Sequence, residues 1–255
     1  MKKTNSRTKD NNSFLIFIPV FNEASSITEI LGKVRKATST AEILVIDDGS
    51  TDKTPELLKK EGNIHVIQHS QNEGYGKTLI DGFNFAINGK YDYVITLDSD
   101  EQHQPEEIIK FTKTVETENW DIVSGSRYLQ KNKEQLNVAP ADRKKINHRI
   151  TEYINHLTGY DLTDSFCGFK LYKVNSLKKL NLTEHGYGMP LELWMQAWKH
   201  LFRIKEVPVD LIYLDKDTNQ TSSYQKIFRR YKYYLQIIEK EIKDYEDISI
   251  SSASR

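Results

Sequence analysis

Two carboxylates stand one residue apart directly after an apolar run in this sequence. Asp98 and Asp100 follow residues 93–97, which read as a buried strand. Carboxylates at the end of such a strand are costly unless a cation lies beside them. Hard divalent cations take oxygen ligands, and Mg²⁺ often shares one or two carboxylates with substrate phosphates. The pattern predicts a cation held between Asp98, Asp100 and a diphosphate; the alternative is a polar turn that caps the strand.

The elements that must position this pair alternate between strand and helix along the first half of the chain. Short continuous apolar runs are typical of strands covered on both faces, and each is followed by apolar residues at helical spacing. The predicted strands are 14–18, 42–46, 64–68, 93–97 and 121–125, and the predicted helices are 24–36, 54–61, 74–88 and 105–117. This order predicts an α/β fold with a mostly parallel, doubly wound sheet and helices on both faces.

Polar segments follow three of these predicted strands. They are residues 19–23, 47–49 and 98–100, and each contains at least one carboxylate. Ligands of doubly wound sheets bind at the carboxyl ends of the strands. We therefore expect the three segments to meet at one edge of the sheet and to form a binding site there.

The second half of the chain is less regular. Its pattern predicts loops at 130–139 and 215–223, helices at 141–157 and 227–245, and a strand at 204–213. We expect a disordered leader over residues 1–12, one catalytic domain over 13–223, and an amphipathic helix with its tail over 224–255. Tyrosine, lysine and arginine in that last helix are typical of a membrane interface. Packing onto the domain and formation of a homodimer are the alternatives.

The composition excludes several classes of protein. The 255 residues carry 36 basic and 36 acidic side chains, so no global field favours nucleic acid as a partner. The single cysteine, Cys167, rules out an internal disulfide framework, and we expect it to be a small buried side chain rather than a nucleophile. No run of about 18 apolar residues predicts a transmembrane helix. We expect a cytoplasmic protein that contacts the inner face of a membrane at most peripherally.

Several motifs together resemble a known family. Residues 19–23 (PVFNE), 45–54 (VIDDGSTDKT) and 98–100 (DSD) are similar to family 2 inverting glycosyltransferases, which have the GT-A fold. Residues 98–103 (DSDEQH), 125–128 (GSRY) and 164–170 (DSFCGFK) resemble the polyprenyl-phosphate sugar synthase branch, of the dolichyl-phosphate mannose synthase type.

The resemblance implies roles for particular residues. Asp98, Asp100 and Gln102 would hold Mg²⁺ or Mn²⁺ against the diphosphate, and Arg127 would lie close to the diphosphate and the acceptor. The family's nucleobase and ribose pocket maps onto four residues: Pro19, Phe21, Glu23 and Asp48.

Five further positions are candidate site residues. Lys77 follows a glycine-rich segment at a helix start and could pair with a phosphate. Arg143 matches the arginine that binds the lipid phosphate in the synthases, but Asn147 stands where they have serine. Asp164 matches a general base, which a hydroxyl acceptor needs and an ionised phosphate does not. Glu192 is expected to hydrogen-bond the donor sugar.

These expectations combine into one function. The chain is expected to move a hexose, with inversion and with a divalent metal, from a GDP- or UDP-linked sugar to a polyprenyl phosphate. The same donor chemistry with a glycan or another hydroxyl acceptor is the alternative. A non-catalytic scaffold that binds nucleotides or membranes is the third hypothesis, although the intact acidic turns argue against it.

Overall fold

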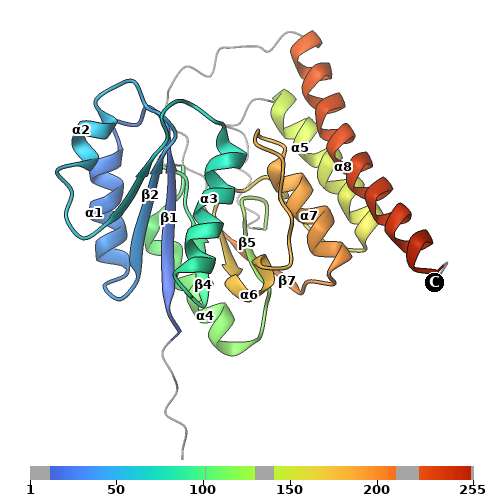
Figure 1. The fold of residues 1–255 in the computed structure, drawn as a ribbon, viewed down its shortest axis with the longest axis horizontal. Coiled ribbons are helices and arrows are strands. Elements are labelled where there is room, and N and C mark those ends of the chain that lie inside the picture. The colour runs from blue at the N-terminus through green and yellow to red at the C-terminus, as the bar shows by residue number, and fades with distance from the viewer. Residues whose placement is uncertain (1–11, 101, 130–140, 211–223, 254–255) are drawn as a thin grey trace, which may run out of the picture.

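The computed structural model describes residues 12–100, 102–129, 141–210 and 224–253, and these form an α/β fold around one mixed sheet (Figure 1). Across the described residues the sheet has seven strands in the order β3-β2-β1-β4-β6-β5-β7. All neighbours pair in parallel except β6, which runs antiparallel to β4 and β5. The strands are β1 (Phe14–Val20), β2 (Glu42–Asp47), β3 (His65–Gln68), β4 (Tyr93–Thr96), β5 (Ile122–Ser126), β6 (Lys170–Lys173) and β7 (Ile204–Pro208). The predicted mostly parallel α/β sheet is therefore confirmed.

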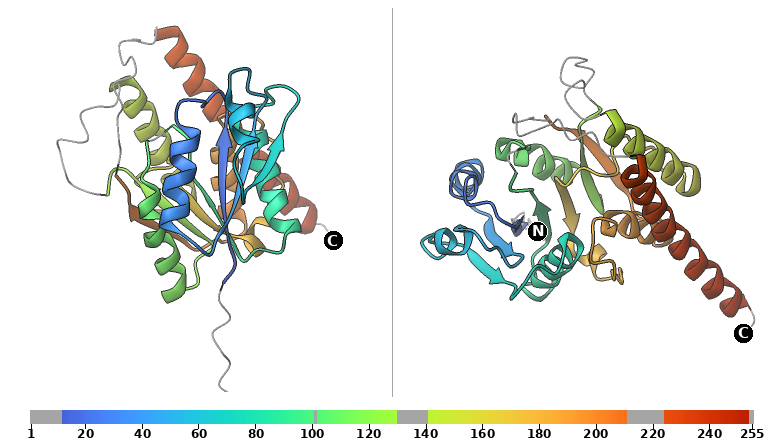
Figure 2. Two further views of the ribbon diagram at one scale, coloured as in Figure 1. Left: turned by 90° about the vertical axis from the view of Figure 1, so that its left-hand side faces the viewer. Right: turned by 90° about the horizontal axis from the view of Figure 1, so that it is seen from above.

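Helices cover both faces of this sheet, as Figure 2 shows from above. One buried cluster joins the strands to α1, α2 and α4, and the other joins them to α3 and to the helices of the second half. The helices are α1 (Ile27–Ala37), α2 (Thr54–Leu58), α3 (Tyr75–Asn88), α4 (Ile108–Thr117), α5 (Ala141–Thr158), α6 (Val174–Leu177), α7 (Met189–Lys199) and α8 (Tyr224–Ala253), with a 3₁₀ turn, η1 (Pro105–Glu107).

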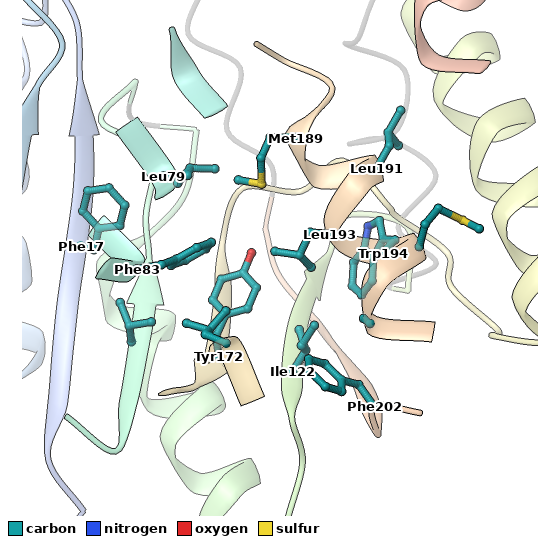
Figure 3. Close-up of a cluster of buried hydrophobic side chains, with 14 of the residues drawn as sticks. Phe17, Leu79, Phe83, Ile122, Tyr172, Met189, Leu191, Leu193, Trp194 and Phe202 are labelled. Carbon is teal, nitrogen blue, oxygen red and sulfur yellow. The ribbon is translucent and has the colours of Figure 1, made fainter. Parts of the chain in front are cut away.

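The strand sequences are continuously apolar because alternate side chains enter different cores. Leu15 and Phe17 of β1 belong to one cluster, whereas Ile16 and Ile18 belong to the other. Figure 3 shows the cluster on the side of α3 and α7, in which the fully buried Trp194 of α7 lies among aliphatic and aromatic side chains. The two cores fix the sheet and leave its polar strand ends at one edge.

Among the described elements, the sequence pattern did not predict β6, α6 and α7, and β6 matters most for the site. Lys170, its first residue, pairs with Thr96 of β4 and with Ser124 of β5. Because β6 is antiparallel, it begins at the edge where its neighbours β4 and β5 end. The segment before it, residues 164–169, is thereby brought to that edge.

The C-terminal helix packs onto the domain. Tyr234, Ile237 and Ile238 of α8 are buried, and Lys199 of α7 pairs with Glu241 at 2.6 Å. Figure 1 shows α8 alongside α5 and α7. In the part of the chain that the structure describes, we find no helix both long and apolar enough to span a bilayer.

The strand predicted over residues 204–213 is observed as Ile204–Pro208, and its last three residues lie outside the described ones. The predicted leader also lies outside them except for residue 12, and the loops predicted at 130–139 and 215–223 lie wholly outside them.

Candidate active site

A cavity of about 510 Å³ opens at the edge where the parallel strands end. Its walls come from the segments after β1, β2, β4 and β5, from residues 166–170, and from the 186–190 segment with α8. Eight of the site residues predicted from the sequence line it: Pro19, Phe21, Glu23, Asp48, Asp98, Asp100, Gln102 and Arg127. The expected gathering of acidic turns at one edge is thus observed.

The two carboxylates of the acidic turn face this cavity together. Tyr75 donates a hydrogen bond to Oδ1 of Asp98 at 3.1 Å, and the backbone N–H of Gln102 donates to Oδ1 of Asp100 at 3.1 Å. Burial raises the pKa of Asp98, and the negative charge of Asp100 raises it further. A cation between the two carboxylates would relieve this repulsion, so the pair is chemically suited to a metal ion.

The rest of the donor set restricts which metal would fit. Within the described ranges, no group of three His, Cys, Asp or Glu side chains gathers as a metal site. A cation here would therefore take its remaining ligands from Gln102, from water or from a bound phosphate. Mg²⁺ is typically bound by one or two carboxylates together with oxygens of the substrate, and Mn²⁺ accepts the same ligands.

Gly168 is required for the close packing around Asp98. A Cβ atom at this position would lie 1.9 Å from Oδ2 and 2.6 Å from Cγ of Asp98. The glycine therefore lets the 164–170 segment pass directly over the acidic turn. This contact joins β6 to the end of β4.

Arg127 and Asp164 form a buried ion pair beside the cavity. Nε of Arg127 donates to Oδ2 of Asp164 at 2.6 Å, and Nη2 donates to Oδ1 at 2.9 Å. Burial raises the pKa of Asp164, but the charge and hydrogen bonds of Arg127 outweigh burial and hold it below its ordinary value.

This pairing changes the interpretation of Asp164. It does not line the cavity, and both its oxygens are occupied by Arg127. A general base needs a free oxygen within reach of the proton that it removes. The geometry therefore favours a different role, in which Asp164 orients Arg127.

Lys170 is a cavity-lining cation that sequence reasoning missed as a site residue. Its side chain is buried, its Nζ donates to the carbonyl oxygen of Cys167, and it lies 5.5 Å from the ring centroid of Trp194. Burial lowers its pKa, opposed by nearby anionic groups that include Asp98. Only the antiparallel direction of β6 brings this lysine to the site.

Cys167 is buried, as expected, although it contributes to the cavity wall. Burial raises the pKa of its thiol to about 12, and the charge of Asp164 adds to the effect. The thiol is therefore protonated near neutral pH, which argues against a nucleophilic role.

The residues of the predicted nucleotide pocket line the cavity beside the acidic turn, where Ser99 Oγ donates to the carbonyl oxygen of Pro19 at 3.1 Å. The Phe21 ring is 44% exposed at the cavity, as a ring that stacks on a base requires. Asp48 accepts hydrogen bonds from the backbone N–H groups of Glu73 and Gly74 at 2.8 and 2.9 Å. Asp48 therefore shapes the 72–74 turn, which also lines the cavity.

The structure does not bring Lys77, Asn147 or Glu192 to this cavity. Lys77 binds both oxygens of Asp81 at 2.6 and 2.5 Å, so its ammonium is not directed to a phosphate site. Asn147 lies on α5 and is absent from the cavity wall, and the side chain of Arg143 lies outside the described residues. Glu192 is buried and accepts hydrogen bonds from residues 183 and 184. It holds that loop and does not face the cavity.

The glycines of the 74–76 segment lie against the loop of residues 184–186. A Cβ on Gly76 would lie 2.3 Å from the carbonyl oxygen of Glu184, and Lys77 N–H donates to the carbonyl of His185 at 3.1 Å. These glycines therefore let the segment pack against the backbone of residues 184–186, and Gly74 also lines the cavity.

Comparison with known proteins identifies the family. The model of "Glycosyl transferase family 2" matches residues 15–180. Undecaprenyl-phosphate mannosyltransferase of Micrococcus luteus is 30% identical over 205 residues, which cover 78% of this chain and 83% of the relative. Polyprenol monophosphomannose synthase of Mycolicibacterium smegmatis is 29% identical over 203 residues, 76% of each chain.

A solved structure confirms the fold. Glucosyl-3-phosphoglycerate synthase from Mycobacterium tuberculosis, crystallised with Mn²⁺, uridine diphosphate and glucosyl-3-phosphoglycerate, has a TM-score of 0.70 to this chain. The match covers 91% of this chain and 80% of that one at 15% identity, so it shows the GT-A fold alone. The chain belongs to glycosyl transferase family 2, in its polyprenyl-phosphate sugar synthase branch, and is a glycosyltransferase.

Proposed function

We propose that this glycosyltransferase moves a hexose from a GDP- or UDP-linked sugar to a polyprenyl phosphate, with inversion and with a divalent metal. The observation that carries the proposal is one cavity lined both by the carboxylates Asp98 and Asp100 and by two basic side chains, Arg127 and Lys170. Carboxylates suit the metal, and the cations suit the phosphates of donor and acceptor. The two named relatives act on lipid phosphates, which supports the same acceptor class here.

In this proposal each group of cavity-lining residues has its own role. Phe21, Glu23 and Asp48 bind the nucleoside, while Asp98, Asp100 and Gln102 would hold Mg²⁺ or Mn²⁺. When bound, the metal ion would neutralise charge on the leaving nucleoside diphosphate.

The state of Asp164 favours a phosphate acceptor over a hydroxyl acceptor. A sugar hydroxyl must lose a proton before it attacks, whereas a phosphate monoester is already ionised near neutral pH. Asp164, the base implied by the resemblance, is bound through both oxygens to Arg127. The guanidinium, oriented by Asp164, is suited to a phosphate oxygen of the acceptor.

A release assay tests the reaction. Purified protein is given GDP-, UDP- and dTDP-sugars with Mn²⁺ and with undecaprenyl phosphate in detergent, with a soluble sugar acceptor or with neither, and nucleoside diphosphate release is measured. We expect one donor class to release diphosphate in a lipid-dependent manner, with formation of a lipid-phosphate sugar. Release stimulated only by soluble sugars would support the hydroxyl alternative, and a lack of release with every donor would contradict the proposal.

We also propose that the first half of α8 contacts an anionic membrane at its inner, cytoplasmic face. Residues 225–238 contain four basic residues and no acidic one, and Phe228 among them is 57% exposed. The exposed basic side chains are Lys226, Arg229, Arg230 and Lys232. Tyr234, on the same helix, lines the cavity, so a bilayer bound here would lie beside the acceptor site.

Sedimentation with liposomes that contain anionic lipid tests this contact. The variant Arg229→Glu/Arg230→Glu is expected to lose binding that the wild type shows. Lys59→Glu/Lys60→Glu is the matched control, because it changes the net charge equally at two exposed residues beside α2, away from α8. Equal binding by both variants would contradict the proposal. A concentration-dependent dimer in light scattering, lost in the α8 variant, would support the homodimer instead.

A further inference from the structure

We propose that His69 is a positioning residue for the nucleotide pocket: it holds Asp48 in place and is itself held by Asp81 and Lys77. The inference rests on the proposed function, because it assigns the pocket to a nucleotide. It gives a role to Lys77, which the sequence singled out and the cavity does not use.

The four side chains form one continuous chain of contacts. His69 follows β3, where its backbone N–H donates to the carbonyl of Asp47 at 2.9 Å. Nδ1 of His69 lies 2.7 Å from Oδ1 of Asp48, and Nε2 lies 3.1 Å from Oδ2 of Asp81. Lys77 then binds both oxygens of Asp81 from one helical turn away on α3.

The two contacts of His69 set a requirement on which ring nitrogens donate hydrogen bonds. Ionised carboxylates only accept hydrogen bonds, so both ring nitrogens must donate for both contacts to hold. The ring thus bridges two carboxylates through its two nitrogens, and Lys77 binds the second carboxylate. Because the side chains of His69 and Asp48 are only 8% and 6% exposed, solvent cannot easily replace a lost partner.

Of these four contacting side chains, only one reaches the cavity. Asp48 lines it, whereas His69, Asp81 and Lys77 do not. The carboxylate of Asp48 also accepts the backbone N–H groups of Glu73 and Gly74. Without His69, Asp48 loses the one side chain that fixes its orientation among these contacts, and the 72–74 wall shifts with it. The effect on a nucleotide is therefore indirect, through Asp48.

The test is a binding measurement on His69→Gln by isothermal titration calorimetry, with GDP and UDP as probes in the presence of Mn²⁺. Glutamine cannot donate from two opposed positions, so one charge-assisted hydrogen bond is lost. We expect dissociation constants about tenfold higher than for the wild type. With the sugar of the tighter-binding nucleotide as donor, KM should rise similarly while kcat stays within about twofold.

His65→Gln is the matched control. His65 is also on β3 and also pairs with a carboxylate, Glu42, at 2.8 Å, but it is exposed and does not line the cavity. We expect its nucleotide affinity to equal that of the wild type. The control distinguishes the loss of the contact between His69 and Asp48 from the loss of any other contact between a histidine and a carboxylate.

Asp81→Asn gives a second, independent reading. It removes the charge that holds His69, so we expect weaker nucleotide binding than in the wild type. In the double variant with His69→Gln it should add little, because both substitutions act through the same contact to Asp48. If His69→Gln does not fold, Asp81→Asn alone decides.

The outcomes are distinct. A wild type that binds neither GDP nor UDP contradicts the proposed function. A wild type that binds, with His69→Gln and Asp81→Asn equally tight, overturns the role of His69 and leaves the proposed function intact. If the losses of nucleotide affinity in the two single variants add fully in the double variant, His69 and Asp81 do not act through one shared contact to Asp48, and the proposed row of contacts is overturned.

Discussion

Substitution of Gly168 by alanine is expected to abolish most activity with little effect on the fold. The added Cβ would lie 1.9 Å from Oδ2 of Asp98, whereas ordinary contact begins at 3.4 Å, so the carboxylate must move by about 1.5 Å. A misplacement of about 1 Å at a reacting centre can cost 10²-fold in rate. We therefore expect turnover at least about 10²-fold below that of the wild type.

The stability of this variant should change much less. The displaced atoms are the end of the Asp98 side chain, which can rotate toward the cavity, and overpacking of this kind costs about 1–3 kcal/mol. Thermal unfolding followed by circular dichroism should show a midpoint lower by several degrees at most, with a cooperative transition.

The assay is lipid-dependent nucleoside diphosphate release at several Mn²⁺ concentrations. Gly32→Ala is the control, since no atom lies within 4 Å of its added Cβ, and it should retain wild-type turnover. Turnover of Gly168→Ala within threefold of the wild type would refute the reasoning, because the carboxylate of Asp98 would then be free to lie elsewhere.

Three further outcomes are expected. Asp100→Asn should lower turnover by roughly 10²-fold or more without loss of fold, the order that removal of one charge-stabilising group costs; unchanged turnover would remove it from the metal site. EDTA should abolish release, and Mn²⁺ or Mg²⁺ should restore it. Asp164→Asn should lower the free energy of unfolding by about 3–5 kcal/mol at neutral pH, because Arg127 is left buried and unpaired.

The pH dependence of that last effect has a definite sign. The folded pKa of Asp164 is lowered, so its contribution to stability is fully present above its unfolded pKa of about 4. It is lost as the pH falls through the folded pKa. Denaturant titrations should therefore show the difference between wild type and Asp164→Asn narrowing below about pH 4. A difference that widened with acid would contradict the ion pair.

The parallel half of the sheet could be predicted because its signals are local. The apolar runs of β1, β2 and β4 each end in polar residues, and the direction of parallel strands alone brings Asp48 and Asp98 to one edge. The hydrophobic pattern and the order of the strands along the sequence were enough to predict that part of the site.

The missed features depend on contacts between distant segments. The sequence of β6 is KLYK, which forms no continuous apolar run, and the direction of β6 depends on its pairing with β4 and β5. The place of Lys170 could not be predicted without it. The pairing of Arg127 with Asp164 also joins residues 37 apart.

Lys77 is a different case. Its partner Asp81 stands four residues later on the same helix, a spacing at which opposite charges meet. That signal was available in the sequence and favoured an internal ion pair over a phosphate contact.

We propose that Asp98 and Asp100 hold one divalent ion against the donor diphosphate. Crystals soaked with Mn²⁺ and the nucleoside diphosphate that binds best would test this site by anomalous scattering from manganese. We expect a single strong peak within coordination distance of both carboxylates and of diphosphate oxygens. A diphosphate bound in the cavity with no manganese peak beside Asp98 and Asp100 would contradict it.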